Sequence, residues 1–150
     1  MTSREQSGAE TDRAAFVLDA SAMLSYLRGD EGGAVVQRVL QQCRDCETRM
    51  AIPASHLLEA YAVAVREAPA LLDDLISLVD QLPLEVCPVT KETAEAAAEL
   101  VASRPELKPE RAAAMAFCGR NGTTLVTADP GMADQPGCLY VGPRAGNPGG

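Results

Sequence analysis

Short apolar runs alternate along the chain with longer stretches in which apolar residues recur every three or four positions. The first run, over residues 14–19, is rich in strand-forming residues, and residues 20–27 then show helical spacing. Later short runs predict further strands at residues 50–53, 84–89, 123–127 and 139–141. Helical periodicity predicts further helices around these runs, at residues 34–43, 55–67, 71–79, 90–103 and 109–121.

Residues with known capping preferences mark where these helices begin and end. Ser55 and Thr90 are the expected N-caps of two helices, and Pro109 stands at the first position of the last one, where proline is favourable. The segment 29–33, which contains three glycines, is expected to break the first helix. Gly122 is expected to end the last helix.

The alternation of strands and helices predicts one α/β domain over residues 14–142, with a mostly parallel sheet covered by helices on both faces. Residues 1–13 are polar and residues 143–150 are rich in Pro and Gly, so both are expected to be disordered tails. No stretch predicts a signal peptide or a membrane span. We therefore expect a cytoplasmic protein that makes no membrane contact.

Composition limits how the chain can bind nucleic acid. Its 150 residues are 47% hydrophobic and carry a net charge of −8. This charge argues against broad electrostatic binding, because phosphate contacts need Lys and Arg, so any nucleic acid would be held by metal ions or by a few local Arg. Cys43 and Cys46 form a C-x-x-C pair without a second pair, which is weak support for zinc and favours reduced thiols.

Candidate chemistry lies just after the predicted strands, at the sheet edge where parallel sheets bind ligands. Asp19 follows the first strand, Asp129 follows the fourth, and Glu59 lies about one turn into the helix after the second. Carboxylates gathered in this way repel one another unless protonation or a cation relieves the repulsion, and oxygen ligands suit Mg²⁺ or Mn²⁺. Each residue alone has a simpler explanation, as a helix cap, a solvated helix residue and a turn residue.

Three motifs resemble those of one family. The sequence FVLDASA at residues 16–22 resembles the opening strand of PIN domains, in which an apolar run ends in Asp-x-Ser. SHLLEA at residues 55–60 is similar to the second motif of the family, and LVTAD at residues 125–129 resembles its closing motif, in which Thr and Asp flank one residue. The resemblance covers residues 14–141. Within the PIN family, the chain is similar to the VapC-type toxins.

The resemblance implies a three-layer α/β/α fold with a central sheet of four to five mostly parallel strands. It further implies an acidic pocket that binds Mg²⁺ or Mn²⁺ and cuts RNA. Asp19, Glu59 and Asp129 would then be metal ligands or catalytic groups that position water, and Ser21 and Thr127 would support them by hydrogen bonds. In VapC-type toxins the implied partners are an antitoxin protein and a second copy of the chain in a homodimer.

The third family motif departs from this pattern. Where the family has Asp followed by Ala early in the penultimate helix, residues 107–112 read LKPERA, so Arg111 takes the place of the Asp. Glu110, one residue earlier, either reaches the same metal site or only interacts favourably with the helix N-terminus. The guanidinium of Arg111 either pairs with the carboxylates in place of a metal, points outward or contacts an RNA phosphate.

Two functions from different classes follow. The first is a metal-dependent endoribonuclease of a toxin–antitoxin system that hydrolyses RNA phosphodiester bonds. The alternative is a catalytically degenerate PIN domain that acts as a binding or regulatory protein, because Arg111 and the acidic charge weaken the nuclease interpretation. His56 is the only histidine, so His-dependent triads and His-zinc sites are disfavoured, and we expect it to pack beside its neighbours at the start of a helix.

Overall fold

The computed structural model of the chain describes residues 14–143, so the expected tails lie outside it apart from Pro143. Its strands and α-helices are, in chain order, β1 (Ala14–Leu18), α2 (Ala20–Arg28), α3 (Glu31–Asp45), β2 (Arg49–Pro53), α4 (Ala54–Glu67), α5 (Leu72–Asp80), β3 (Leu84–Cys87), α6 (Lys91–Ser103), α7 (Pro109–Asn121), β4 (Thr124–Thr127) and β5 (Cys138–Tyr140). Two short 3₁₀ helices are η1 (Pro69–Leu71) and η2 (Pro130–Met132). Within the described range, no helix is both long enough and apolar enough to cross a bilayer.

The strands form one five-stranded sheet in the order β3-β2-β1-β4-β5, and every neighbouring pair is parallel. This confirms the predicted parallel sheet. Since β1 is central and β4 lies beside it, the residues that follow these two strands meet at the middle of one sheet edge. Asp19 and Asp129 are therefore close neighbours in space although 110 positions separate them in the sequence.

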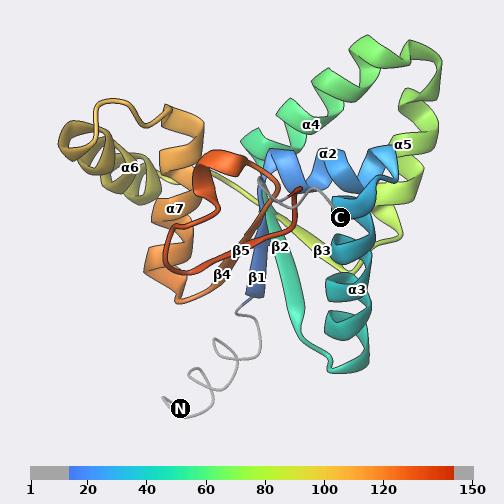
Figure 1. The fold of residues 1–150 in the computed structure, drawn as a ribbon, viewed down its shortest axis with the longest axis horizontal. Coiled ribbons are helices and arrows are strands. Elements are labelled where there is room, and N and C mark those ends of the chain that lie inside the picture. The colour runs from blue at the N-terminus through green and yellow to red at the C-terminus, as the bar shows by residue number, and fades with distance from the viewer. Residues whose placement is uncertain (1–13, 144–150) are drawn as a thin grey trace.

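Helices cover both faces of the sheet (Figure 1), with α2 to α5 on one side and α6 and α7 on the other. Consecutive residues of β1 point to opposite faces, as the pleat of a strand requires. Val17 belongs to the apolar cluster that includes Ala114 of α7, whereas Leu18 belongs to the cluster that includes Met23 of α2. These two cores confirm the three-layer α/β/α architecture.

Most of the predicted helix ends agree with the structure. Thr90 caps α6, with its hydroxyl accepting a hydrogen bond from the Thr93 amide at 3.2 Å, and Gly122 ends α7 in the left-handed conformation with φ of 63°. The prediction for Ser55 is wrong. The α4 helix begins one residue earlier, with Pro53 at the N-cap position and no side-chain cap, so Ser55 lies inside the helix.

The glycine-rich break between the first two helices is shorter than predicted. The α3 helix begins at Glu31 because the Asp30 carboxylate accepts a hydrogen bond from the Gly33 amide at 2.9 Å. Gly33 lies inside this helix, where a Cβ would come within 2.3 Å of the Ser25 carbonyl oxygen of α2. Only Gly29, with φ of 70°, ends α2. Gly33 therefore serves helix packing rather than chain reversal.

Candidate functional site

A small pocket of about 90 Å³ opens at the carboxyl edge of the sheet. It is lined by the carboxyl-bearing residues Asp19, Glu59, Glu110 and Asp129, the cations Lys108 and Arg111, and Ala20, Ser21 and His56. The structure thus brings the four predicted acidic residues to one site. It also brings Arg111 there. The catalytic and metal-binding roles of these residues stay predictions.

Asp19 is positioned by the junction of β1 and α2. Its backbone amide donates to the Val126 carbonyl at 3.2 Å, which continues the pairing of β1 with β4. Its carboxylate Oδ1 accepts hydrogen bonds from the Ala22 amide at 2.9 Å and from the Ser21 hydroxyl at 2.6 Å. Asp19 is therefore the N-cap of α2 as well as a pocket carboxylate, and it is only 6% exposed.

Ser21 and Thr127 connect the two central strand ends. The Ala128 amide donates to Ser21 Oγ at 2.9 Å, and Ser21 Oγ lies 3.2 Å from Thr127 Oγ1. The Asp129 amide donates to Thr127 Oγ1 at 3.1 Å. Since the Ser21 hydroxyl donates its proton to Asp19, the Thr127 hydroxyl must be the donor in its bond with Ser21. This network fixes where Asp19 and Asp129 stand relative to each other.

Asp129 is held on both of its carboxylate oxygens. Oδ1 accepts a hydrogen bond from the Gly131 amide at 2.9 Å, so Asp129 caps the short η2 helix. Oδ2 forms an ion pair with the Arg111 guanidinium. The side chains of Arg111 and Asp129 are 28% and 22% exposed, so the pair lies in a partly desolvated position. Arg111 points into the pocket, and not outward.

Glu59 and Glu110 complete the acidic lining from two helices. Glu59 lies on α4 and Glu110 in the first turn of α7, and both are exposed. Among the described residues, neither carboxylate has a hydrogen-bond or ion-pair partner. Unlike Asp19 and Asp129, these two side chains are free to change rotamer.

A divalent cation does not fit this arrangement. The carboxylate oxygens have the right chemistry for Mg²⁺ or Mn²⁺. However, no three His, Cys, Asp or Glu side chains within residues 14–143 stand close enough together to hold a metal ion. Arg111 also pairs with Oδ2 of Asp129, a carboxylate that the resemblance assigns to the metal site. A positive side chain therefore stands where the resemblance implies a cation.

His56 belongs to the site, although we expected it only to pack beside its neighbours. It is 3% exposed, its Nδ1 accepts a hydrogen bond from the Ala20 amide at 3.0 Å, and its Nε2 lies 2.7 Å from the Glu110 carbonyl oxygen. The sequence contained one usable signal. His56 precedes Glu59 by three positions, which places both on the same side of a helix.

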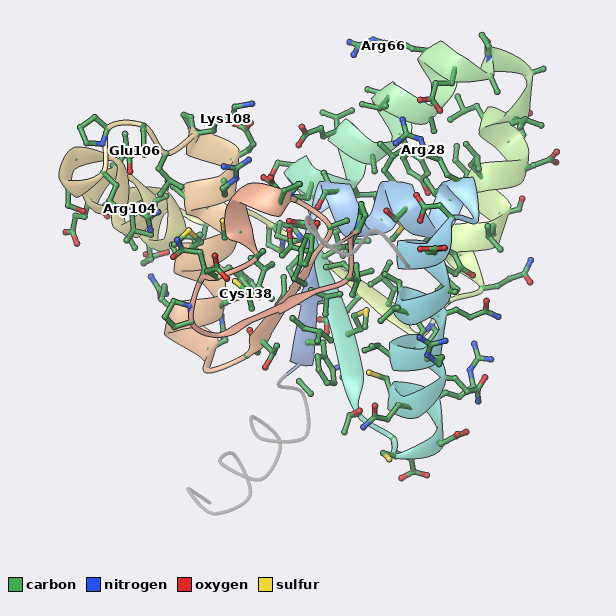
Figure 2. All side chains as sticks on the ribbon, viewed as in Figure 1. Arg28, Arg66, Arg104, Glu106, Lys108 and Cys138 are labelled. Atoms are coloured by element: carbon green, nitrogen blue, oxygen red, sulfur yellow. The ribbon has the colours of Figure 1, made fainter. Side chains whose placement is uncertain are left out.

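Lys108 is a second residue that the sequence interpretation missed. It is the N-cap residue of α7 and lines the pocket, but its side chain makes no capping hydrogen bond. Figure 2 shows Lys108 where the connection from α6 enters α7, and Arg104 and Glu106 are labelled on that side of the molecule. Lys108 is exposed, so it contributes positive charge at the rim of the pocket.

Comparison with known proteins identifies one family. A family model described as PIN domain matches residues 16–137 of the chain. None of the curated proteins compared with the chain matches it.

Several solved structures share the fold at low sequence identity. A toxin–antitoxin complex from Klebsiella pneumoniae is 16% identical over 83% of this chain and 96% of that chain, with a TM-score of 0.61. PAE2754 from Pyrobaculum aerophilum is 19% identical over 85% of this chain and 90% of that chain, with a TM-score of 0.64. DNA-bound VapBC from Salmonella typhimurium is 18% identical over 85% and 98%, with a TM-score of 0.62. At these identities the likeness shows the fold alone.

Proposed function

This chain belongs to the PIN domain family, and we propose that it is a catalytically degenerate member, a binding or regulatory protein in which Arg111 replaces the metal. One observation carries the proposal, the ion pair between Arg111 and Asp129 inside the acidic pocket. A guanidinium stays protonated at any physiological pH, so this positive charge is permanent. A divalent ion would have to displace it to reach Asp129.

The hydrogen bonds of the pocket support the same conclusion. Asp129 uses one carboxylate oxygen for the Gly131 amide and the other for Arg111. Asp19 uses Oδ1 for two donors from the first turn of α2. Metal binding at Asp129 would therefore compete with the Arg111 contact, and it would also bring two positive charges close to a third. The cation already present compensates part of the carboxylate repulsion.

The proposed partner is a small antitoxin-like protein. The solved structures that share the fold include toxin–antitoxin complexes, so this fold is compatible with such a partner. The net charge of −8 favours a protein partner with basic residues over extended contact with nucleic acid. A homodimer remains part of the proposal, as expected from the resemblance to VapC-type toxins.

Calorimetric titration with Mn²⁺ tests the proposal. The protein with Arg111 should bind Mn²⁺ weakly, and Arg111→Asp should bind it at least about tenfold more tightly, because a fixed cation is exchanged for a ligand. A fluorescent RNA should stay intact with the parent protein and be cut by the variant. Arg111→Asp combined with Asp19→Asn is the matched control and should lose both gains. Efficient cleavage by the parent that the Arg111→Asp variant weakens would contradict the proposal.

A metal-dependent endoribonuclease is the second candidate function. It is favoured by the gathering of four carboxylates in one pocket and by the freedom of Glu59 and Glu110 to rearrange. In this case the parent should cut RNA in Mg²⁺ and stop after chelation. Asp19→Asn should abolish cleavage, whereas Glu106→Gln, which changes an exposed carboxylate outside the pocket, should leave it unchanged.

A further inference from the structure

The imidazole of His56 lies where three segments of the pocket meet. His56 is in the first turn of α4, Ala20 is the first residue of α2, and Glu110 lies in the first turn of α7. The ring bonds to Ala20 and Glu110 through backbone groups that are 36 and 54 positions away in the sequence. Each of the three segments also supplies a pocket carboxylate.

The bond to Ala20 satisfies a group that its own helix cannot. The first amides of a helix have no intrahelical acceptor. In α2, Asp19 Oδ1 accepts from the Ala22 amide, and His56 Nδ1 accepts from the Ala20 amide at 3.0 Å. The ring and the Asp19 carboxylate therefore cap the same helix from two sides. Anything that moves the ring also affects the residue that follows Asp19.

The bond to Glu110 holds a part of α7 that has few other constraints. The α7 helix begins without a side-chain cap, and Pro109 and Glu110 in its first turn are exposed. Among the described residues, the His56 contact is the only hydrogen bond from another element to the backbone of this turn. The contact is short, at 2.7 Å, and it ends on the residue directly before Arg111.

Only one form of the ring satisfies both partners. Nδ1 receives an N–H, so it carries no proton, and Nε2 faces a carbonyl oxygen, so it carries one. A neutral ring with the proton on Nε2 makes both bonds at once. The residue is 3% exposed, and its ring has no other partner among the described residues for either nitrogen.

We propose that His56 is a positioning residue that fixes the first turn of α7 against the first turn of α2 and thereby keeps Arg111 on Asp129. The inference rests on the proposed function and extends it, because it names the residue that keeps the Arg111 guanidinium in the same pocket. Ser21 and Thr127 set the position of Asp129 relative to α2, and His56 sets the position of Arg111 relative to α2. Both residues of the ion pair are therefore positioned relative to α2.

Substitutions that keep one bond at a time test this role. His56→Asn retains an acceptor near Nδ1 but does not reach Glu110, whereas His56→Gln retains a donor near Nε2 and loses the acceptor for Ala20. Hydrogen exchange of the Ala20 amide, followed by NMR, reports the bond to Ala20, and exchange of the Arg111 Nη–H groups, which pair with Asp129, reports whether the first turn of α7 still holds Arg111 in place. Ser55→Ala, at the exposed neighbouring position of α4, is the matched control.

We expect opposite patterns in the two variants. In His56→Asn the Arg111 Nη–H groups should exchange about tenfold faster while the Ala20 amide stays protected, and in His56→Gln the Ala20 amide should be the one that exchanges faster. Equal Arg111 exchange in the parent, in His56→Asn and in Ser55→Ala would overturn the inference. This readout contains neither metal nor RNA, so it can fail while the proposed function holds, and the reverse is equally possible.

The parent protein provides a test that does not depend on the folding of a variant. The ¹⁵N chemical shifts of the His56 ring should report a bare Nδ1 and a protonated Nε2 in the folded protein. The opposite tautomer, or a ring that averages between tautomers, would rule out both backbone bonds and with them the positioning role. The predicted tautomer together with variant-specific exchange would establish the role.

Discussion

The helices α2 and α7 both begin at the pocket, yet their first turns are built in different ways. The first turn of α2 is buried, and its N-cap, Asp19, accepts two hydrogen bonds. The first turn of α7 is mostly exposed, and its N-cap, Lys108, makes no side-chain bond. One start is part of the protein interior, whereas the polar contacts between the other start and distant segments are one hydrogen bond from His56 and the ion pair of Arg111.

This difference explains where the sequence follows the PIN pattern and where it departs. At the start of α2, each pocket side chain also caps or connects a structural element, so a substitution there affects folding. At the start of α7, the side chain of Arg111 is 28% exposed and its polar contact is the ion pair with Asp129, so we expect that the charge of the pocket can change while the fold is kept. The exposed first turn of α7 therefore determines the charge of the pocket, and the buried first turn of α2 determines its geometry.

The later turns of α7 should respond to substitution as strongly as α2 does. Ala114 is 1% exposed and packs in the cluster with Val17 and Leu125. Ala114→Leu inserts three carbons where there is no space and should lower the free energy of unfolding by about 2–3 kcal/mol, measured by urea denaturation. Ala102→Leu on the exposed side of α6 is the control and should change it by less than about 0.5 kcal/mol. Similar values for both would show that α7 is loosely packed throughout.

Alkaline pH gives a second test of the buried side of α7. Burial raises the pKa of the Cys118 thiol to about 11. The folded pKa then exceeds the unfolded value of about 8.5, so this contribution to stability is fully present below about pH 8.5 and is lost as pH rises towards 11. The loss should reach about 3 kcal/mol by pH 11.

Cys118→Ala isolates this effect, because the alanine variant lacks the titrating thiol. The difference in unfolding free energy between parent and variant should be constant up to about pH 8.5 and then shrink. A difference that stays constant through pH 11 would mean that the thiol is accessible to water in the folded state.

Much of the fold could be predicted because the sequence encodes it locally. Short apolar runs gave the strands, and Thr90 and Gly122 gave helix ends, since a cap acts on the amides or carbonyls of the nearest turn. Gly33 was misinterpreted as a breaker. Its glycine is required by the Ser25 carbonyl of a neighbouring helix, and such a requirement is visible only after the helices have packed.

The prediction of the site succeeded where the position along a strand or helix determines the geometry. It failed where distant segments determine it. Asp19 and Asp129 follow strands, and any parallel sheet brings such positions to one edge. The direction of Arg111 was one of three alternatives that the sequence left open, and the structure shows it paired with Asp129. His56 was missed because its partners are backbone groups of distant segments, which have no side-chain signature in the sequence.

Asp19 should be needed for stability as a cap, independently of any chemistry. Asp19→Ala removes the acceptor of the Ala22 amide and should lower the unfolding free energy by about 1 kcal/mol, because relief of carboxylate repulsion offsets part of the lost capping. Asp19→Asn keeps the accepting oxygen and should be close to the parent. At the other helix, Lys108→Ala should change stability by less than about 0.5 kcal/mol, since its side chain caps nothing. A larger effect at Lys108 than at Asp19 would reverse the comparison of the two helix starts.

Replacing Arg111 by Met should have a small effect on folding. The Arg111–Asp129 pair is partly exposed, and ion pairs in such positions contribute about 1 kcal/mol or less. Met keeps the length of the side chain and its packing, so urea denaturation should show a small loss at low ionic strength and almost none at high salt. Mn²⁺ affinity, in contrast, should rise to a value between those of the parent and Arg111→Asp, because Met removes the competing cation without adding a ligand. Lys108→Met tests whether the rise in Mn²⁺ affinity is a general charge effect, since it removes a rim cation that has no ion-pair partner among the described residues. If Lys108→Met raises Mn²⁺ affinity as much as Arg111→Met does, the net charge of the pocket, and not the ion pair with Asp129, keeps the metal out.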